Sequence, residues 1–261
     1  MKKIVLSLLC LLMITGCGKE NIKLDLTKVS SELDTLTTDA IDIHGIDTES
    51  MDVFSDLDYV YDYDFMDIIG LEPELVTDYN VQYNYKKKQI LAIFKPADGK
   101  KDEVKEQLND FMTEEKAELQ EINDLLVYVA SSDNESVFKK IKETKTPVFG
   151  MMMEVTKEQI KDTLNIEESD VSEFLMKMPM MMTQSNTYII VKPVDGKEDV
   201  VKSAVEDYMK KLETQWETYL PDQYELVKNR KEAKIGDYLV YIVSNNNDLV
   251  FDTISKNKIA E

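Results

Sequence analysis

The sequence has few of the residues on which common catalytic and structural sites depend. It contains 1 histidine, 2 cysteines, 8 glycines and 6 prolines in 261 residues. The single histidine, His44, excludes a zinc site built from several histidines, and any histidine-based triad would depend on it. No glycine-rich phosphate-binding loop is present. We therefore expect a protein that is not an enzyme and has no cofactor, with long helices joined by short turns.

Basic residues are also scarce, at 31 lysines and arginines against 51 acidic residues, which gives a net charge of -20. Such a surface repels phosphate backbones, so nucleic-acid binding is not expected. It also disfavours docking on anionic lipid through a basic patch.

The N-terminus has the features of an export signal. Lys2 and Lys3 precede an apolar run from Ile4 to Ile14. A transmembrane helix needs about 20 apolar residues, so this run is too short for a stable span. It ends in small residues before Cys17, which resembles the bacterial lipobox. The resemblance implies a signal peptide over 1–16, lipid on the Cys17 sulfur and a tether over 17–25.

The cysteine count agrees with a lipid anchor. Cys10 lies in the signal peptide, so Cys17 is the one thiol of the mature chain and no intramolecular disulfide can form. Acyl chains such as palmitate give stable anchoring when two or more are attached. The predicted location is the cell membrane, on its extracytoplasmic face.

A repeat organises the rest of the chain. FKPADGK at 94–100 returns as VKPVDGK at 191–197, and LVYVASSDNESVF at 126–138 returns as LVYIVSNNNDLVF at 239–251. One order of segments used twice indicates an internal duplication.

Apolar spacing and turn residues assign elements to the second repeat, 148–261. They predict helices at 156–164 and 169–178, strands at 180–183 and 187–192, helices at 197–219 and 221–227, a hairpin of 231–235 with 238–243, and a helix at 248–254. Paired hairpins favour an α+β fold of two tandem related domains, each a small antiparallel sheet covered by helices.

The first repeat, 26–147, is the reduced copy. We expect a leading helix at 26–41 and a closing helix at 138–145. It has no counterpart of Tyr219 to Tyr238. It is therefore predicted to lack one short helix and the first strand of the second hairpin.

Three stretches of the second repeat carry a family likeness: MPMMMTQSNTYIIVKPVDGKEDVVK, YLPDQYELVKNR and GDYLVYIVSNNND. They resemble the family called domain of unknown function 4358, which recurs in lipoproteins of Gram-positive bacteria. The likeness covers roughly 154–254 and is weaker over 26–138. It implies an extracytoplasmic lipoprotein and carries over no activity and no catalytic residue.

The aromatic residues Trp216, Tyr219 and Tyr224 are the candidate partner-binding surface, because Trp and Tyr are enriched at binding hot spots. The alternative is packing, since Trp216 continues the apolar stripe of the predicted long helix.

Two groups of residues could hold a metal. Methionines at 151–153, 176, 178 and 180–182 could bind Cu(I), although methionine is more often core filling. Aspartates alternate with aromatic residues in the first repeat and could bind calcium, although a solvated face is favoured: Asp52, Asp56, Asp58, Asp62, Asp64 and Asp67.

The sequence thus predicts a membrane-anchored extracytoplasmic lipoprotein that serves as a non-catalytic binding or envelope-associated module, with an envelope protein as its candidate partner. The alternatives are an extracytoplasmic metal-binding (calcium or copper) lipoprotein and, third, an envelope hydrolase that uses His44.

Overall fold

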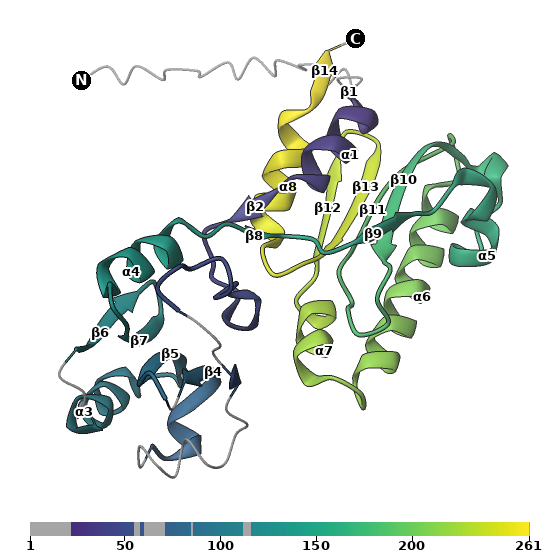
Figure 1. The fold of residues 1–261 in the computed structure, drawn as a ribbon. Coiled ribbons are helices and arrows are strands. Elements are labelled where there is room, and N and C mark those ends of the chain that lie inside the picture. Colours follow the sequence, from purple (N-terminus) through teal and green to yellow (C-terminus); the bar gives the residue numbers. More distant parts are fainter. Residues whose placement is uncertain (1–21, 55–57, 60–70, 85, 112–115, 261) are drawn as a thin grey trace, which may run out of the picture. The chain divides into compact units, whose positions relative to one another are not determined.

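The computed structural model describes residues 22–54, 58–59, 71–84, 86–111 and 116–260. The chain divides into two compact units (Figure 1). Among the described residues, unit 1 combines 22–36 with 148–260, and unit 2 lies within Thr37–Pro147. Unit 2 is thus an insertion in the sequence of unit 1.

Unit 1 is built on a five-stranded antiparallel sheet of order β12-β13-β11-β10-β9. Its strands are β9 (Met152–Glu154), β10 (Val171–Pro179), β11 (Thr187–Pro193), β12 (Lys231–Ile235) and β13 (Tyr238–Val243). Every residue of β13 is buried, which is expected of an inner strand covered on both faces.

Helices cover both faces of this sheet. They are α1 (Leu26–Asp34), α5 (Ile160–Leu164), α6 (Glu198–Trp216), α7 (Pro221–Lys228) and α8 (Asn247–Lys256). On one face, Val201 and Val205 of α6 pack in a core cluster with Ile189 of β11. On the other face, α1 and α8 bury their apolar sides against the sheet, in a second cluster that includes Val29 and Val250.

The N-terminal segment is held to the C-terminal end of unit 1. Strand β1 (Ile22–Leu24) pairs antiparallel with β14 (Lys258–Ala260). The Asn257 side chain donates to Glu32 of α1 at 2.7 Å. These bonds explain why α1 belongs to unit 1 although unit 2 follows it in sequence.

Unit 2 contains a second five-stranded antiparallel sheet, of order β3-β4-β5-β7-β6. Its strands are β3 (Asp58–Tyr59), β4 (Val76–Asn84), β5 (Gln89–Pro96), β6 (Ala117–Ile122) and β7 (Leu125–Ala130). Helix α3 (Lys101–Phe111) contributes to one core cluster and α4 (Asn134–Glu143) to another. The short strands β2 (Thr37–Thr38) and β8 (Thr146–Pro147) pair where the chain enters and leaves the unit.

The two sheets have the same strand order, and the repeated turns have the same geometry. Gly99 and Gly196 have positive φ, at 73° and 77°. In each turn an amide closes the same loop, from Lys100 to Ala97 O and from Lys197 to Val194 O, both at 2.9 Å. The sequence repeat therefore corresponds to a repeated local structure.

A second repeated feature lies after the inner hairpin strand of each sheet. Asn134 Oδ1 accepts from the Ser131 amide at 2.8 Å, and Asn247 Oδ1 accepts from the Ser244 amide at 2.9 Å. Each serine hydroxyl also donates to the same oxygen, at 2.9 and 3.0 Å. These networks start α4 and α8 in the same way.

The α+β prediction is confirmed, and the helices at 197–219 and 221–227 correspond to α6 and α7. The helix predicted at 169–178 is wrong, because 171–179 is strand β10. This strand buries apolar residues on both of its faces: Leu175 belongs to one core cluster and Met176 to the other. Its apolar residues therefore do not alternate along the sequence, and their spacing resembles that of a helix. The strand predicted at 180–183 is also wrong, since these residues form the bend before β11.

The first repeat differs from its prediction in two ways. The first strand of its second hairpin is present as β6, whose alternating polar residues are typical of an edge strand. The leading helix ends at Asp34, and residues 26–36 pack in unit 1 rather than with 37–147. In the structure, unit 2 ends at Pro147 and unit 1 resumes at Val148.

Candidate functional site

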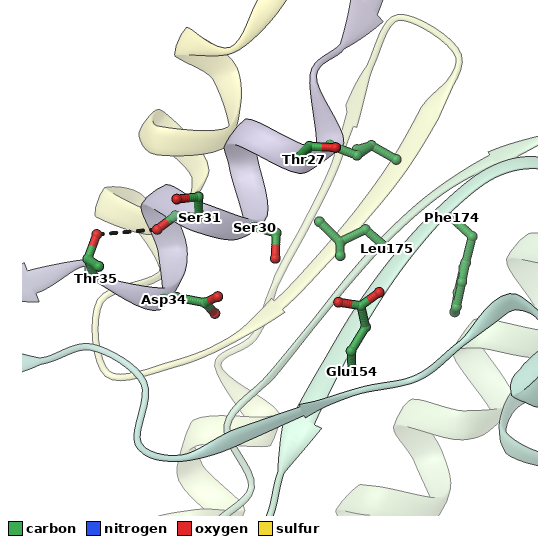
Figure 2. Close-up of a pocket in the computed structure, with 9 residues that line it drawn as sticks. Thr27, Ser30, Ser31, Asp34, Thr35, Glu154, Phe174 and Leu175 are labelled. Carbon is green, nitrogen blue, oxygen red and sulfur yellow. Dashed lines mark hydrogen bonds between the residues drawn. The ribbon is translucent and has the colours of Figure 1, made fainter.

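Unit 1 contains a pocket of about 520 Å³ between α1 and the edge of its sheet (Figure 2). Six of its nine lining residues carry a hydroxyl or a carboxylate, and the other three are apolar. The nine are Leu26, Thr27, Ser30, Ser31, Asp34, Thr35, Glu154, Phe174 and Leu175. The opening exists because β9 pairs with β10 only over Lys177 to Pro179. On the β9 side, the earlier part of β10 therefore has no strand partner among the described residues, while β11 pairs along its other side and α1 contacts it.

Helix α1 presents a polar face to this pocket. Its N-cap is Asp25, whose side chain accepts a hydrogen bond from the Lys28 amide at 3.0 Å. Val29 and Leu33 are buried against the sheet. The hydroxyls of Ser30 and Thr27 lie on the side that lines the pocket (Figure 2). The helix is therefore amphipathic, with small hydroxyl residues where charged ones are common.

A buried lysine lies behind the pocket. The Lys177 ammonium donates to both carboxylate oxygens of Asp34, at 2.6 and 2.7 Å. The side chain of Lys177 is 10% exposed and that of Asp34 is 47% exposed. The pair keeps a nearly buried charge compensated, because an unpaired one would be costly to bury.

Glu154 is the carboxylate of the pocket without such a partner. It projects from the end of β9 into the space between α1 and Phe174 (Figure 2). Lys177 faces it across the β9–β10 ladder but forms its ion pair with Asp34. Among the described residues, Glu154 has no ion-pair partner. The three groups together carry one net negative charge, which attracts a cation.

Tyr188 lies beneath these groups. It is 1% exposed, its ring packs against Phe149 at 5.3 Å, and it faces Lys177 across the β10–β11 ladder. Its hydroxyl has no hydrogen-bond partner of ordinary geometry among the described side chains. Burial raises the pKa of Tyr188, the Asp34 carboxylate raises it further and the Ser30 hydroxyl lowers it. Tyr188 is therefore a neutral phenol.

The three residues of the candidate aromatic surface differ in burial: Trp216 lies in the core, whereas Tyr219 is exposed. Trp216 is 1% exposed and belongs to the core of unit 1, although its indole Nε1 lacks a hydrogen-bond partner within the described part of the chain. Tyr219 is 59% exposed, with its ring 5.7 Å from that of Trp216. Tyr224 packs at the edge of the core, with Lys228 over its ring at 5.6 Å. Tyr219 is thus the aromatic residue of the three with a largely free face.

The structure describes only some of the residues of the remaining predicted sites. Cys17 lies outside the described residues, as do Asp56, Asp62, Asp64 and Asp67. Among the described residues, no group of three or more His, Cys, Asp or Glu side chains is arranged to hold a metal ion. No helix in the described part of the chain is long and apolar enough to cross a membrane.

His44 forms an exposed pair in unit 2. Its Nε2 lies 2.9 Å from Asp78 Oδ1, and the two side chains are 64% and 43% exposed. His44 itself lies in the short 3-10 helix Ile43–Gly45.

Comparison with known families identifies the central part of unit 1. Residues 145–244 match the family described as Domain of unknown function (DUF4358). This part of the chain is a DUF4358 domain. The comparison with curated proteins found no match, and the comparison with solved structures found none. The DUF4358 domain contributes Glu154 and Phe174 to the pocket, whereas α1 lies outside the matched residues.

Sequence reasoning did not find this pocket. Its residues come from α1, β9 and β10, and β10 was predicted as a helix. The signal that could have found it is Lys177, a lysine in an otherwise apolar segment, which requires a carboxylate partner.

Proposed function

We propose that this chain is a lipid-anchored, extracytoplasmic binding module that holds a small ligand in the pocket of unit 1 and does not catalyse a reaction. The observation that carries the proposal is the pocket itself, with hydroxyl groups and the unpaired carboxylate of Glu154 around a compensated Asp34–Lys177 pair. Ligand sites commonly combine an apolar wall with a few convergent polar groups.

The lining favours one class of ligand. An ammonium group complements Glu154, the hydroxyls of α1 can bond to hydroxyl or amide groups, and Phe174 can pack against a small apolar part. The net charge of -20 also attracts cations to the surface. We therefore propose a small amine that carries further hydrogen-bonding groups.

Isothermal titration calorimetry with glucosamine tests this proposal. N-acetylglucosamine, which lacks the positive charge of the ammonium group, is the control ligand. We expect glucosamine to bind and N-acetylglucosamine not to bind. Glu154→Gln should weaken the affinity for glucosamine about tenfold. Glu217→Gln removes the same charge at an exposed position of unit 1 outside the pocket and should leave binding unchanged. Equal binding of both ligands, or equal weakening by both variants, contradicts the proposal.

The anchor is tested separately, on cells that express the full chain. Wild-type protein is expected in the membrane fraction, labelled by a fatty-acid probe, and Cys17→Ser protein is expected to lose the label. A Cys17→Ser protein that is still acylated would contradict the anchor.

A partner protein at the envelope is a second candidate, and the exposed ring of Tyr219 favours it. Pull-down from membranes with wild-type and Tyr219→Ser protein tests it, because loss of a captured protein only in the variant supports a role for this ring.

A further inference from the structure

Four methionines lie together where β9 meets β10. In the ladder of these strands, Met153 faces Met178 and Met152 faces Pro179. One step beyond, the Met180 amide donates to Met151 O at 2.9 Å, which continues the pairing. Since alternate residues of a strand point to the same face, the ladder brings Met151, Met153, Met178 and Met180 to one face as two facing pairs.

The neighbouring residues confirm this alternation. Met152 packs with the core cluster on the α1 face, and Lys177 reaches Asp34 on the same side. Met178 packs at the edge of the core cluster on the opposite, α6 face. The four methionines therefore project from the α6 face, away from the pocket that contains Glu154.

Core filling accounts in part for Met178 but does not explain the other three methionines. Met176 and Met209 are 0% exposed and fill the core, as methionine usually does. In contrast, Met151, Met153 and Met180 are 65%, 44% and 61% exposed. Five of the nine large apolar side chains most exposed in the described chain are methionines of this region, including Met181 and Met182. Such a gathering on a surface indicates a use.

The arrangement supplies several soft ligands within reach of one ion. Facing residues in an antiparallel ladder have Cβ atoms about 4.5–5.5 Å apart, and each methionine has three rotatable side-chain bonds. Four thioether sulfurs can therefore turn toward a common point. Neutral thioethers favour soft ions such as Cu(I) over calcium or magnesium, which require oxygen ligands.

In the described part of unit 2, the corresponding pair of residues contains no methionine. In its ladder of β3 and β4, Tyr83 faces Asp58 at the position that corresponds to Met178 and Met153. The methionine group is therefore a feature of unit 1, rather than a by-product of the shared strand order.

We propose that Met151, Met153, Met178 and Met180 form a surface site for Cu(I). The ion binds without change of oxidation state, as neutral thioethers replace the ligands it arrives with. The site is independent of the amine-binding pocket, so either proposal can fail alone.

The test uses the mature chain with Cys17→Ser, so that no thiol competes for the ion. Anaerobic titration with Cu(I), held by a chromogenic chelator, measures the stoichiometry and the affinity. We expect one ion per chain and an affinity about tenfold or more lower in Met153→Leu/Met178→Leu. Met182→Leu, at an 88% exposed position outside the ladder, is the matched control and should bind as tightly as the parent chain.

A second readout locates the ion. In protein labelled with ¹³C at the methionine methyls, Ag(I), a redox-stable analogue, should shift the resonances of the four ladder methionines and leave Met176 and Met209 in place. Thermal melting confirms that the leucine variants fold. The proposal is overturned if the parent chain takes no Cu(I) from the chelator, or if the double leucine variant binds as tightly as the parent. After either result, the exposed methionines would be interpreted as a surface for protein contact rather than as a metal site.

Discussion

The Lys177 ammonium donates to both carboxylate oxygens of Asp34, at 2.6 and 2.7 Å, and thereby joins α1 to the edge of the DUF4358 domain. The lysine is almost buried while the aspartate is half exposed. The pair therefore positions the polar face of α1 over β10 and helps to form the pocket.

Asp34→Asn should destabilise unit 1 by about 1–2 kcal/mol, because Lys177 would be left buried beside a neutral partner. The cost is below that of a fully buried pair since Asp34 is 47% exposed. Chemical denaturation followed by circular dichroism measures the change. Asp207→Asn, which breaks a pair with both side chains more than 60% exposed, should change stability by less than about 0.5 kcal/mol. Equal effects of the two variants would show that the Lys177 pair has no special role.

Gly196→Ala and Gly99→Ala should each destabilise their own unit by about 1–2 kcal/mol. Both glycines have positive φ, and an added Cβ meets no atom within 4 Å, so the cost is conformational rather than steric. Asparagine tolerates this backbone region better, so the corresponding Asn variants should cost less. Hydrogen exchange assigns each loss to a unit, and an alanine variant as stable as the wild type would contradict the shared turn geometry.

Stability should fall between pH 10 and 12, in part through Tyr208. Burial raises the pKa of Tyr208 to about 12 from an ordinary value of 10.0. In this window the unfolded chain loses the phenolic proton while the folded chain keeps it, so rising pH favours unfolding. Tyr208→Phe should reduce the slope of stability against pH, measured by urea denaturation at several pH values. Tyr219→Phe is the control and should keep the wild-type slope. An unchanged slope in Tyr208→Phe would contradict the prediction.

Trp216→Ala should destabilise unit 1 by about 3–5 kcal/mol, because the indole is 1% exposed in the core. Tyr219→Ala, at a 59% exposed position, should cost less than about 0.5 kcal/mol. Trp216 is also the one tryptophan of the chain, so its fluorescence reports burial directly. Strong quenching by acrylamide in the folded protein would contradict the packed position and restore Trp216 as a surface anchor.

Local patterns predicted the parts of the fold that depend on local chemistry. The Asp-Gly turns, the long helix α6 and the β12–β13 hairpin follow from turn residues and apolar spacing. Strand β10 did not, since both of its faces are covered and its apolar residues imitate a helical stripe. The position of α1 in unit 1 could not be predicted either, because it depends on bonds such as that between Asn257 and Glu32, far apart in sequence.

The pocket could not be predicted from local patterns either, because its residues come from segments far apart in the sequence. Asp34, Glu154 and Lys177 meet only after α1 is placed against β9 and β10. The methionines were visible in the sequence, but the register of Met153 with Met178 was needed to show which of them share a face.

We propose that the pocket between α1 and β10 binds an amine. Amide chemical-shift mapping on the ¹⁵N-labelled mature chain during titration with glucosamine tests it most directly. We expect shifts at Ser30, Asp34, Glu154 and Phe174 that saturate, and about tenfold more glucosamine should be needed to reach the same shifts in Glu154→Gln. Shifts confined to other parts of the chain, or no shift at saturating amine, would contradict it.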